Sequence, residues 1–283
     1  MRGRAFAPGG ISCCNAIIAG RGATAAIDLG VEVEVELERG NKGITVETID
    51  YPEVDTSLVE RCVGRVLERG DTTMHAWVRT RSTIPPSVGL KTSSAVANGS
   101  ILATLDALDA SDTMDRREMV DLGIEAAREV GVTVTGALDD AMASMFGGLV
   151  MTDNLRTTVI DCRDLEEYVA IVIPSEGTIS TSVDTEALQR YGEVGDLAFE
   201  LVRGDDHHLG MTVNGLAVTA ALELDPTPTT VGLSHTTGVS VSGTGPAVAG
   251  IGPEQPIADL AATWEEFGHV LTTQTRSDGA SIA

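Results

Sequence analysis

The chain has 283 residues, which is enough for one large domain or two ordinary ones with a sizeable core. Its 42 acidic residues against 19 basic ones give a net charge of −23, which argues against a nucleic-acid partner because that role needs a basic face. No apolar run approaches the roughly 18 residues that a membrane helix needs, so we expect no membrane partner.

The composition also indicates the surroundings in which this protein works. Lysine occurs only at Lys42 and Lys91, and aromatic residues make up 3% of the chain. An acidic, lysine-poor composition suggests a high-salt cytoplasm, because concentrated salt screens the repulsion between carboxylates. The first residues show no signal-peptide pattern, so a cytoplasmic location is expected. The four cysteines form no C-x-x-C pair and are interpreted as reduced thiols.

Alternating and helical patterns predict the first elements. Residues 31–38 alternate valine or leucine with glutamate, which predicts a half-buried strand with its glutamates in solvent. A turn at 39–43 leads to a second strand at 44–49, so we predict a hairpin. Helical spacing follows at 58–69, and residues 75–83 alternate again as a strand.

The most informative segment is the loop from Ile84 to Ala95, which enters a predicted helix at 93–108. Glycine, serine and threonine before a helix suit phosphate, because backbone N–H groups and the helix dipole favour an anion there. The loop is not a Walker A motif, since Lys91 follows Leu90 rather than glycine. The alternative interpretation is an ordinary helix N-cap.

Two adjacent carboxylates follow the next predicted helix, at 116–130. Asp139 and Asp140 come after a Thr-Gly turn at 135–136, and their neighbours in the sequence are small or apolar residues. If they face the phosphate loop, Asp139 can orient or deprotonate an acceptor hydroxyl. If they only open a helix, they are partners of its dipole. Upstream, Glu125 and Glu129 lie one helical turn apart and point either to magnesium or to solvent.

The second half alternates strands and helices, which predicts an α+β chain of two lobes with a boundary near 150–165. Strands are predicted at 168–173, 237–242, 247–251 and 270–273, and helices at 184–203, 206–222 and 257–267. Gly243-Thr244-Gly245 is by itself weak evidence for a ligand, and a plain hairpin turn is the default. His207 and His208 lie in a polar stretch and are expected at the surface.

The order of these segments resembles the GHMP small-molecule kinases. A Pro-Gly loop near the N-terminus precedes P-x-x-x-G-L-x-x-S-S-A, then the Thr-Gly…Asp segment, then G-T-G-P-A. Within that group the chain is most similar to the archaeal shikimate kinases, through an extra residue in the loop, VTGA-x-DDA-x-AS at 134–144 and DGASI at 278–282. Lys91 departs from the wider group, which commonly has a small residue there.

The resemblance implies a two-lobed GHMP kinase fold of the α+β class. Residues 1–155 would form an N-terminal lobe like domain 2 of ribosomal protein S5, and residues 156–283 a ferredoxin-like C-terminal lobe. It further implies phosphorylation of the 3-hydroxyl of the small molecule shikimate, with ATP and Mg²⁺ as cofactors. Homoserine or mevalonate as acceptor is an alternative, as is a nucleotide-binding regulator without catalysis.

The resemblance also implies roles for individual residues. Asp139 matches the catalytic aspartate of the group. The expected ATP contacts are Pro86, Ser87, Val88, Gly89, Leu90, Lys91, Thr92, Ser93, Ser94 and Ala95. Magnesium would be held by Ser94, or Ser93, together with Glu129, or else Glu125. The expected substrate contacts are Asn15, Arg21, Thr135, Gly136, Gly243, Thr244 and Gly245, with the Arg21 guanidinium on the acceptor carboxylate.

Overall fold

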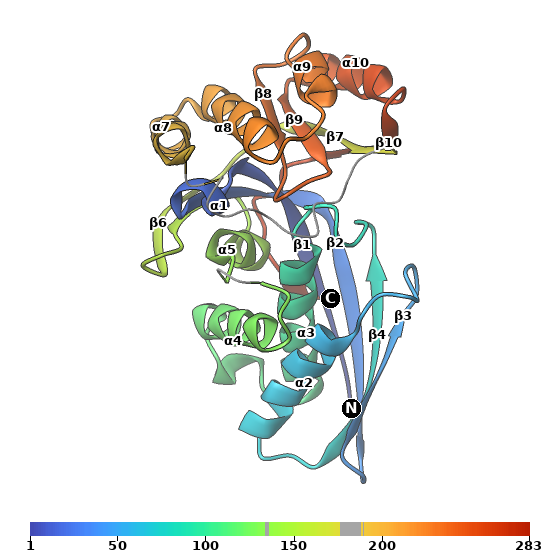
Figure 1. Ribbon diagram of the computed structural model, residues 1–283. Coiled ribbons are helices and arrows are strands. Elements are labelled where there is room, and N and C mark those ends of the chain that lie inside the picture. Colours follow the sequence, from blue (N-terminus) through green and yellow to red (C-terminus); the bar gives the residue numbers. More distant parts are fainter. Residues whose placement is uncertain (134–135, 176–187, 189) are drawn as a thin grey trace.

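The computed structural model describes residues 1–133, 136–175, 188 and 190–283, and it shows two lobes (Figure 1). The first lobe contains β1 (Arg2–Cys14), α1 (Ala16–Ala19), β2 (Arg21–Arg39), β3 (Gly43–Thr48), α2 (Ser57–Arg69), β4 (Met74–Ser82), α3 (Thr92–Ala107), η1 (Ser111–Thr113), α4 (Arg116–Glu129), α5 (Leu138–Phe146), β5 (Leu149–Asp153), β6 (Thr158–Arg163) and β11 (Ser281–Ile282). The second contains β7 (Tyr168–Pro174), α7 (Gly192–Arg203), α8 (His207–Ala221), α9 (Thr227–Gly232), β8 (Gly238–Val241), β9 (Val248–Gly252), α10 (Glu254–Trp264) and β10 (Gly268–Gln274).

The first lobe is built on a seven-stranded sheet in the order β11-β1-β2-β4-β3, with β5 pairing β2 and β6. The 19-residue strand β2 pairs β5 along residues 21–25 and β4 along residues 31–39. The alternation predicted for residues 31–38 is confirmed, because its valines and leucine are buried and its glutamates are not. On the outer face, Glu34 and Glu36 pair with arginines of β1.

The predicted hairpin of residues 31–49 is wrong in its pairing. The strand at 43–48 exists, but β4 inserts between it and β2, so that β3 pairs β4 in parallel. The chain leaves β3, crosses through α2 and returns as β4 between β3, which is the edge strand, and β2. A strand–helix–strand crossover of this kind places parallel strands side by side. Local turn signals do not reveal which later strand will take the position between the two arms.

The helices predicted at 58–69, 93–108 and 116–130 are confirmed as α2, α3 and α4. They lie together on one face of the sheet (Figure 1). Helix α3 is buried on nearly all sides from Ala95 to Ala107, as expected for a helix surrounded by sheet and neighbouring helices. Asp115 and Glu118 form a capping box at the start of α4.

The second lobe has an antiparallel sheet in the order β10-β7-β9-β8. With helices between β7 and β8 and between β9 and β10, its order of elements matches the expected ferredoxin-like lobe. The strands and helices predicted from 206 onward correspond to α8, β8, β9, α10 and β10. The helix predicted at 184–203 is described from Gly192 as α7, and most of its earlier residues lie outside the described part.

The sheet of the first lobe extends past the expected boundary at residue 155, because β6 pairs β5 and the C-terminal strand β11 returns to β1. The core is also shared, since Ile171 and Phe199 belong to the same buried cluster as Val33. The lobes therefore pack as one body around the N-terminal strands. Among the described residues, no helix has the length and apolar character needed to cross a membrane.

Candidate active site

A cavity of about 410 Å³ opens between the loop before α3, the inner face of α4 and the turn between β8 and β9. The loop contributes Ser87 and residues 89–94, and the turn contributes residues 243–245. Gly136, Ala137 and Asp140 line it at the start of α5. The fold thus brings together three of the four segments on which the resemblance was based, although they are distant in the sequence.

The loop presents the N-terminus of α3 to this cavity. Lys91 is the N-cap residue, with φ +64°, and no side chain of the described residues caps the helix. Thr92, Ser93 and Ser94 in the first turn all line the cavity. The Thr92 hydroxyl donates to Pro85 O at 3.1 Å, which leaves the hydroxyls of Ser93 and Ser94. An uncapped N-terminus of a 16-residue helix, together with these two hydroxyl groups, is suited to bind a phosphate group.

Direct contact with the second lobe fixes the shape of the loop. The Ser242 hydroxyl donates to Gly89 O at 2.8 Å, and the backbone N–H of Ala247 donates to Val88 O at 3.1 Å. Gly89 has φ +93°, and a Cβ there would lie 2.0 Å from Ser242 O. Glycine is therefore required at position 89 by conformation and by space.

We expect Gly89→Ala to lower the free energy of unfolding by about 2–4 kcal/mol, because a left-handed alanine and a steric clash act together. Gly131→Ala is the matched control, since Gly131 has φ +74° but nothing within 4 Å of its Cβ position. That variant should lose only about 1 kcal/mol. Urea denaturation of both variants measures the difference, and equal losses would contradict the role of the Gly89 contact.

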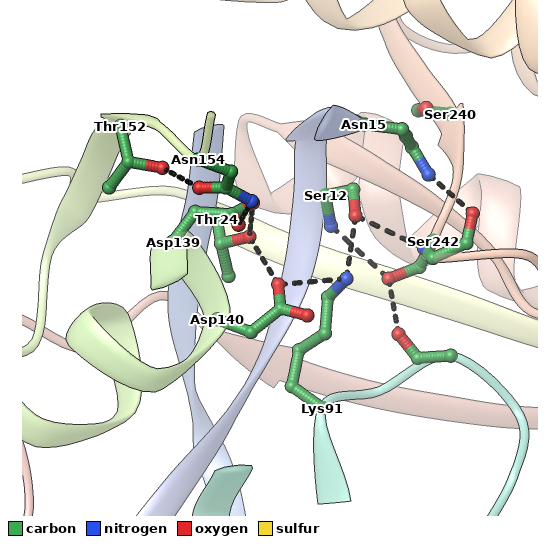
Figure 2. A network of polar contacts seen from close by, with 12 residues as sticks. Ser12, Asn15, Thr24, Lys91, Asp139, Asp140, Thr152, Asn154, Ser240 and Ser242 are labelled. Carbon is green, nitrogen blue, oxygen red and sulfur yellow. Dashed lines mark hydrogen bonds and ion pairs between the residues drawn. The ribbon is translucent and has the colours of Figure 1, made fainter. Parts of the chain in front are cut away.

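Beside the loop, a buried polar network joins both lobes to the two aspartates (Figure 2). Lys91 Nζ lies 3.0 Å from Asp140 Oδ1 and donates to Ser12 Oγ at 2.8 Å. Only 6% of the Lys91 side chain is exposed, so its charge is balanced inside the protein. Ser12 Oγ also accepts from the backbone N–H of Gly243 at 3.1 Å.

Asp139 lies behind Asp140, away from the cavity lining. Its Oδ1 accepts a hydrogen bond of 2.9 Å from Asn154 Nδ2, and the Asn154 amide is itself oriented by the hydroxyl of Thr152. Thr24 Oγ1 lies 3.0 Å from Asp139 Oδ2 and 2.8 Å from Asp140 Oδ1. A hydroxyl carries a single proton, so Thr24 shares it between the two carboxylates.

The pKa of Asp139 is raised from 3.8 to about 6, first by burial and then by the charge of the neighbouring Asp140. Lys91, Asn154 and Thr24 act in the opposite direction and keep the carboxylate ionised at neutral pH. A carboxylate with this pKa is a stronger base than an exposed aspartate, yet it is charged in the range where a general base must act.

The C-terminal segment holds α5, the helix that carries both aspartates. The backbone N–H of Ala280 donates to Ser144 O at 2.9 Å, and Arg116 donates to both Met145 O and Ala280 O. A Cβ on Gly279 would lie 2.1 Å from Met145 O. The VTGA-x-DDA-x-AS and DGASI segments, which carry the finer resemblance, are thus in contact with each other.

Two expected substrate contacts are held elsewhere in the fold. Arg21 donates to Asp196 Oδ1 at 2.7 Å and Glu200 Oε1 at 2.6 Å, both on α7. Asn15 is buried, bonds to Asn214 through its backbone and side chain, and donates to Gly243 O. Both residues join the lobes, and neither lines the cavity.

The remaining expected residues are divided between cavity and surface. Gly136 and the Gly243–Gly245 turn line the cavity, whereas Thr135 lies outside the described residues. Glu129 pairs with Arg61 and Arg65 of α2, so the structure does not bring it to Ser94. Glu125 also pairs with Arg65. Among the described residues that line the cavity, Asp140 is the acidic one.

Several residues of the site were missed by sequence reasoning. Thr24, Asn154, Ser12 and Ser242 are all buried polar residues in or next to strands. Asn98 is buried on α3, donates to Ala141 O at 3.0 Å and lines the cavity. The available signal was a polar residue within an otherwise apolar element, because a buried polar group needs a partner.

The comparisons with known proteins agree with this geometry. The family described as "GHMP kinases N terminal domain" matches residues 57–148. The shikimate kinase of Halobacterium salinarum is 42% identical over 281 residues, covering 99% of both chains. Those of Methanothrix thermoacetophila and Methanosarcina mazei are 40% and 39% identical, covering 95% and 99% of this chain and 91% and 96% of theirs.

Solved structures with the same fold are more distant in sequence. Homoserine kinase from Cytophaga hutchinsonii aligns with a TM-score of 0.78 at 18% identity, covering 100% of this chain and 97% of that one. Mevalonate kinase from Methanococcus jannaschii aligns with a TM-score of 0.73 at 15% identity, covering 97% and 98%. These likenesses confirm the two-lobed GHMP kinase fold.

Proposed function

We infer that the acceptor is shikimate, because this chain belongs to the archaeal shikimate kinase family, within the GHMP kinases. The proposed reaction transfers the γ-phosphoryl group of ATP to the 3-hydroxyl of shikimate. The observation that carries the proposal is a cavity that opens on an uncapped helix N-terminus and is lined by Asp140, with the buried Asp139, of raised pKa, next to Asp140 and joined to it through Thr24. A phosphate site and a base are the two parts that phosphoryl transfer needs most.

In the proposed mechanism, the residues of the loop bind the phosphates through the backbone of the first turn of α3 and the hydroxyls of Ser93 and Ser94. Asp139 takes the proton of the acceptor hydroxyl as the new O–P bond forms and the bond from the γ-phosphorus to the β–γ bridging oxygen breaks. Asn154 and Thr24 hold the Asp139 carboxylate in position. Lys91 stabilises the negative charge that develops on the transferring group, as an ammonium in a buried site does effectively.

Mg²⁺ would fit this donor set. The hydroxyl of Ser94 and the carboxylate of Asp140 are hard oxygen ligands, and both line the cavity. Magnesium is usually held by one or two carboxylates together with substrate phosphates. When bound, it neutralises charge on the phosphates. Glu129 stays a predicted ligand, but for that role it would have to leave Arg61 and Arg65.

The test is ADP release in molar KCl with Mg²⁺ and ATP, with shikimate, homoserine and mevalonate offered separately. Turnover with shikimate alone is the expected result. Turnover with another acceptor would keep the kinase mechanism but overturn the acceptor. ATP binding with no turnover on any acceptor would favour the non-catalytic regulator.

Activity should depend on the ionisation of Asp139. Because its pKa is about 6, kcat/KM should rise as pH increases through about 6 and then level off. Below that pH the carboxyl is protonated and cannot accept the hydroxyl proton. A pH–rate profile with subsaturating shikimate measures this limb in the free enzyme. An acid limb near pH 4, the range of an exposed aspartate, would contradict the assignment.

Arg21 stays the predicted partner of the shikimate carboxylate. For that role the acceptor would have to displace Asp196 or Glu200 from the guanidinium. Arg21→Gln should then raise KM for shikimate while KM for ATP stays the same. A lower melting temperature with unchanged KM would instead assign Arg21 to holding α7 against β2.

A further inference from the structure

Two histidines and a glutamate converge at one end of the second sheet, outside the candidate active site. Glu167 directly precedes β7, and His207 and His208 open α8. The Nε2 atoms of His208 and His207 lie 2.9 Å and 3.3 Å from the same Oε1 of Glu167. The three side chains are half-buried, so the cluster is open to solvent on one side. The sequence had placed both histidines simply at the surface.

One ring nitrogen in this cluster lacks a hydrogen bond. Nε2 of His208 is buried and has no hydrogen-bond partner among the described residues, although it lies only 2.9 Å from Glu167 Oε1. The two atoms are therefore in close contact, but the donor–acceptor angle between them is not that of a well-aligned hydrogen bond. Buried nitrogens in folded proteins nearly always have a partner, and coordination of a bound ion would satisfy this one.

Both sides of the cluster are firmly held. The backbone N–H of Glu167 donates to Thr275 Oγ1 at 2.9 Å, and the N–H of Thr275 donates to Glu167 O at 2.9 Å. His208 packs against the start of β8, where a Cβ on Gly238 would lie 2.9 Å from its Cδ2. The ligand atoms are thus brought together by rigid elements, which is what a preformed metal site needs.

We propose that Glu167, His207 and His208 bind a divalent transition-metal ion, with Zn²⁺ as the best match. Ligands about 2.0 Å from a tetrahedral zinc ion lie about 3.3 Å from one another. The two histidine–glutamate separations are close to this value, and all three ligand atoms lie within 4.8 Å of one another. Two imidazoles and one carboxylate favour zinc, cobalt or nickel over magnesium. Water would take the fourth position, on the open side.

This site is separate from the magnesium of the proposed reaction. His208 contacts Gly238, which begins β8, whereas Gly243 and the cavity follow the opposite end of that strand. Metal bound here would connect β7 to α8 and stabilise the second lobe. Its presence can therefore be measured without an activity assay.

The experiment is titration of the chelator-treated full chain with Zn²⁺ by calorimetry, in molar KCl with millimolar Mg²⁺ to fill the carboxylate sites. We expect one Zn²⁺ per chain, and a melting temperature that rises with Zn²⁺. His208→Ala and His207→Ala should each weaken binding by more than about 100-fold, beyond the effect typical of an outer-shell residue. Glu167→Gln, which keeps the shape of the side chain, should weaken it as well.

His75→Ala is the matched control, because His75 lies on β4 of the other lobe beside Thr45. It should bind Zn²⁺ as the unaltered chain does. Circular dichroism verifies that each variant is folded. Absence of Zn²⁺ binding by the unaltered chain, or unchanged binding in the His208→Ala and Glu167→Gln variants, would overturn the proposal.

Discussion

Asp139→Asn should reduce turnover by about 10²–10⁴-fold while the fold persists, because the variant loses the group proposed to accept the hydroxyl proton. Asparagine has nearly the same shape and keeps an oxygen that can accept from Asn154. The loss should appear in kcat, with the affinity for ATP little changed. Steady-state kinetics and ATP titration of the variant measure both quantities.

The same substitution should make the protein more stable at neutral pH. Burial raises the folded-state pKa of Asp139 to about 6, above its ordinary value of 3.8, so the fold favours the neutral carboxyl. This contribution to stability is fully present below about pH 4 and is lost as pH rises through 6. The neutral asparagine has no such loss. The melting-temperature difference between variant and parent should therefore grow from pH 4 to 6 and then stay constant.

Two further variants test whether Asp139 is the aspartate that acts as the base. Asp161→Asn, on the partly exposed strand β6, should leave turnover and its pH dependence unchanged. Asp140→Asn removes the partner of Lys91 and a candidate magnesium ligand, so it should raise the Mg²⁺ requirement. Wild-type turnover in Asp139→Asn, with turnover lost in Asp140→Asn, would transfer the role of base to Asp140.

Lys91→Met should reduce kcat by about 10²–10³-fold, the usual cost of removing one group that stabilises charge in the transition state. It should also shift the acid limb of the pH–rate profile above pH 6. Lys91 lowers the pKa of Asp139, so removing its charge lets burial and Asp140 raise that pKa further. The shift of the limb measures the electrostatic coupling between Lys91 and Asp139, and the loss of kcat at a pH well above the limb measures the stabilisation of the transition state by Lys91.

The chain offers a matched control, because its other lysine is Lys42. Its side chain is 71% exposed and approaches Glu68 at 4.0 Å. Lys42→Met removes the same charge and should leave both kcat and the acid limb unchanged. Lys91→Arg retains a positive charge, so its limb should stay near pH 6 even if turnover falls. An unshifted limb in Lys91→Met would refute the coupling between Lys91 and Asp139.

The contacts made by individual residues were beyond sequence reasoning. Arg21 and Glu129 are residue types that suit a carboxylate and a magnesium ion, yet Arg21 is paired with charges on α7 and Glu129 with charges on α2. Ion pairs of this kind form between residues far apart in the chain, so local sequence does not reveal them. Thr24 and Asn154 were missed for the same reason, since they gain their roles only by meeting Asp139.

The sequence by itself determined many of the helices and strands and the chemistry of the loop. Period-two alternation at 31–38 and helical spacing at 58–69 specify which face of each element is buried. Apolar side chains are driven out of water, so the face on which they gather packs against the core. The order of the glycine-rich segments indicated the family. Only the tertiary structure decided that β4 separates β2 from β3, that Lys91 reaches Asp140, and that Asp139 is buried deeply enough to raise its pKa. These outcomes depend on packing between distant segments, and pKa values depend on the charges and burial that such packing creates.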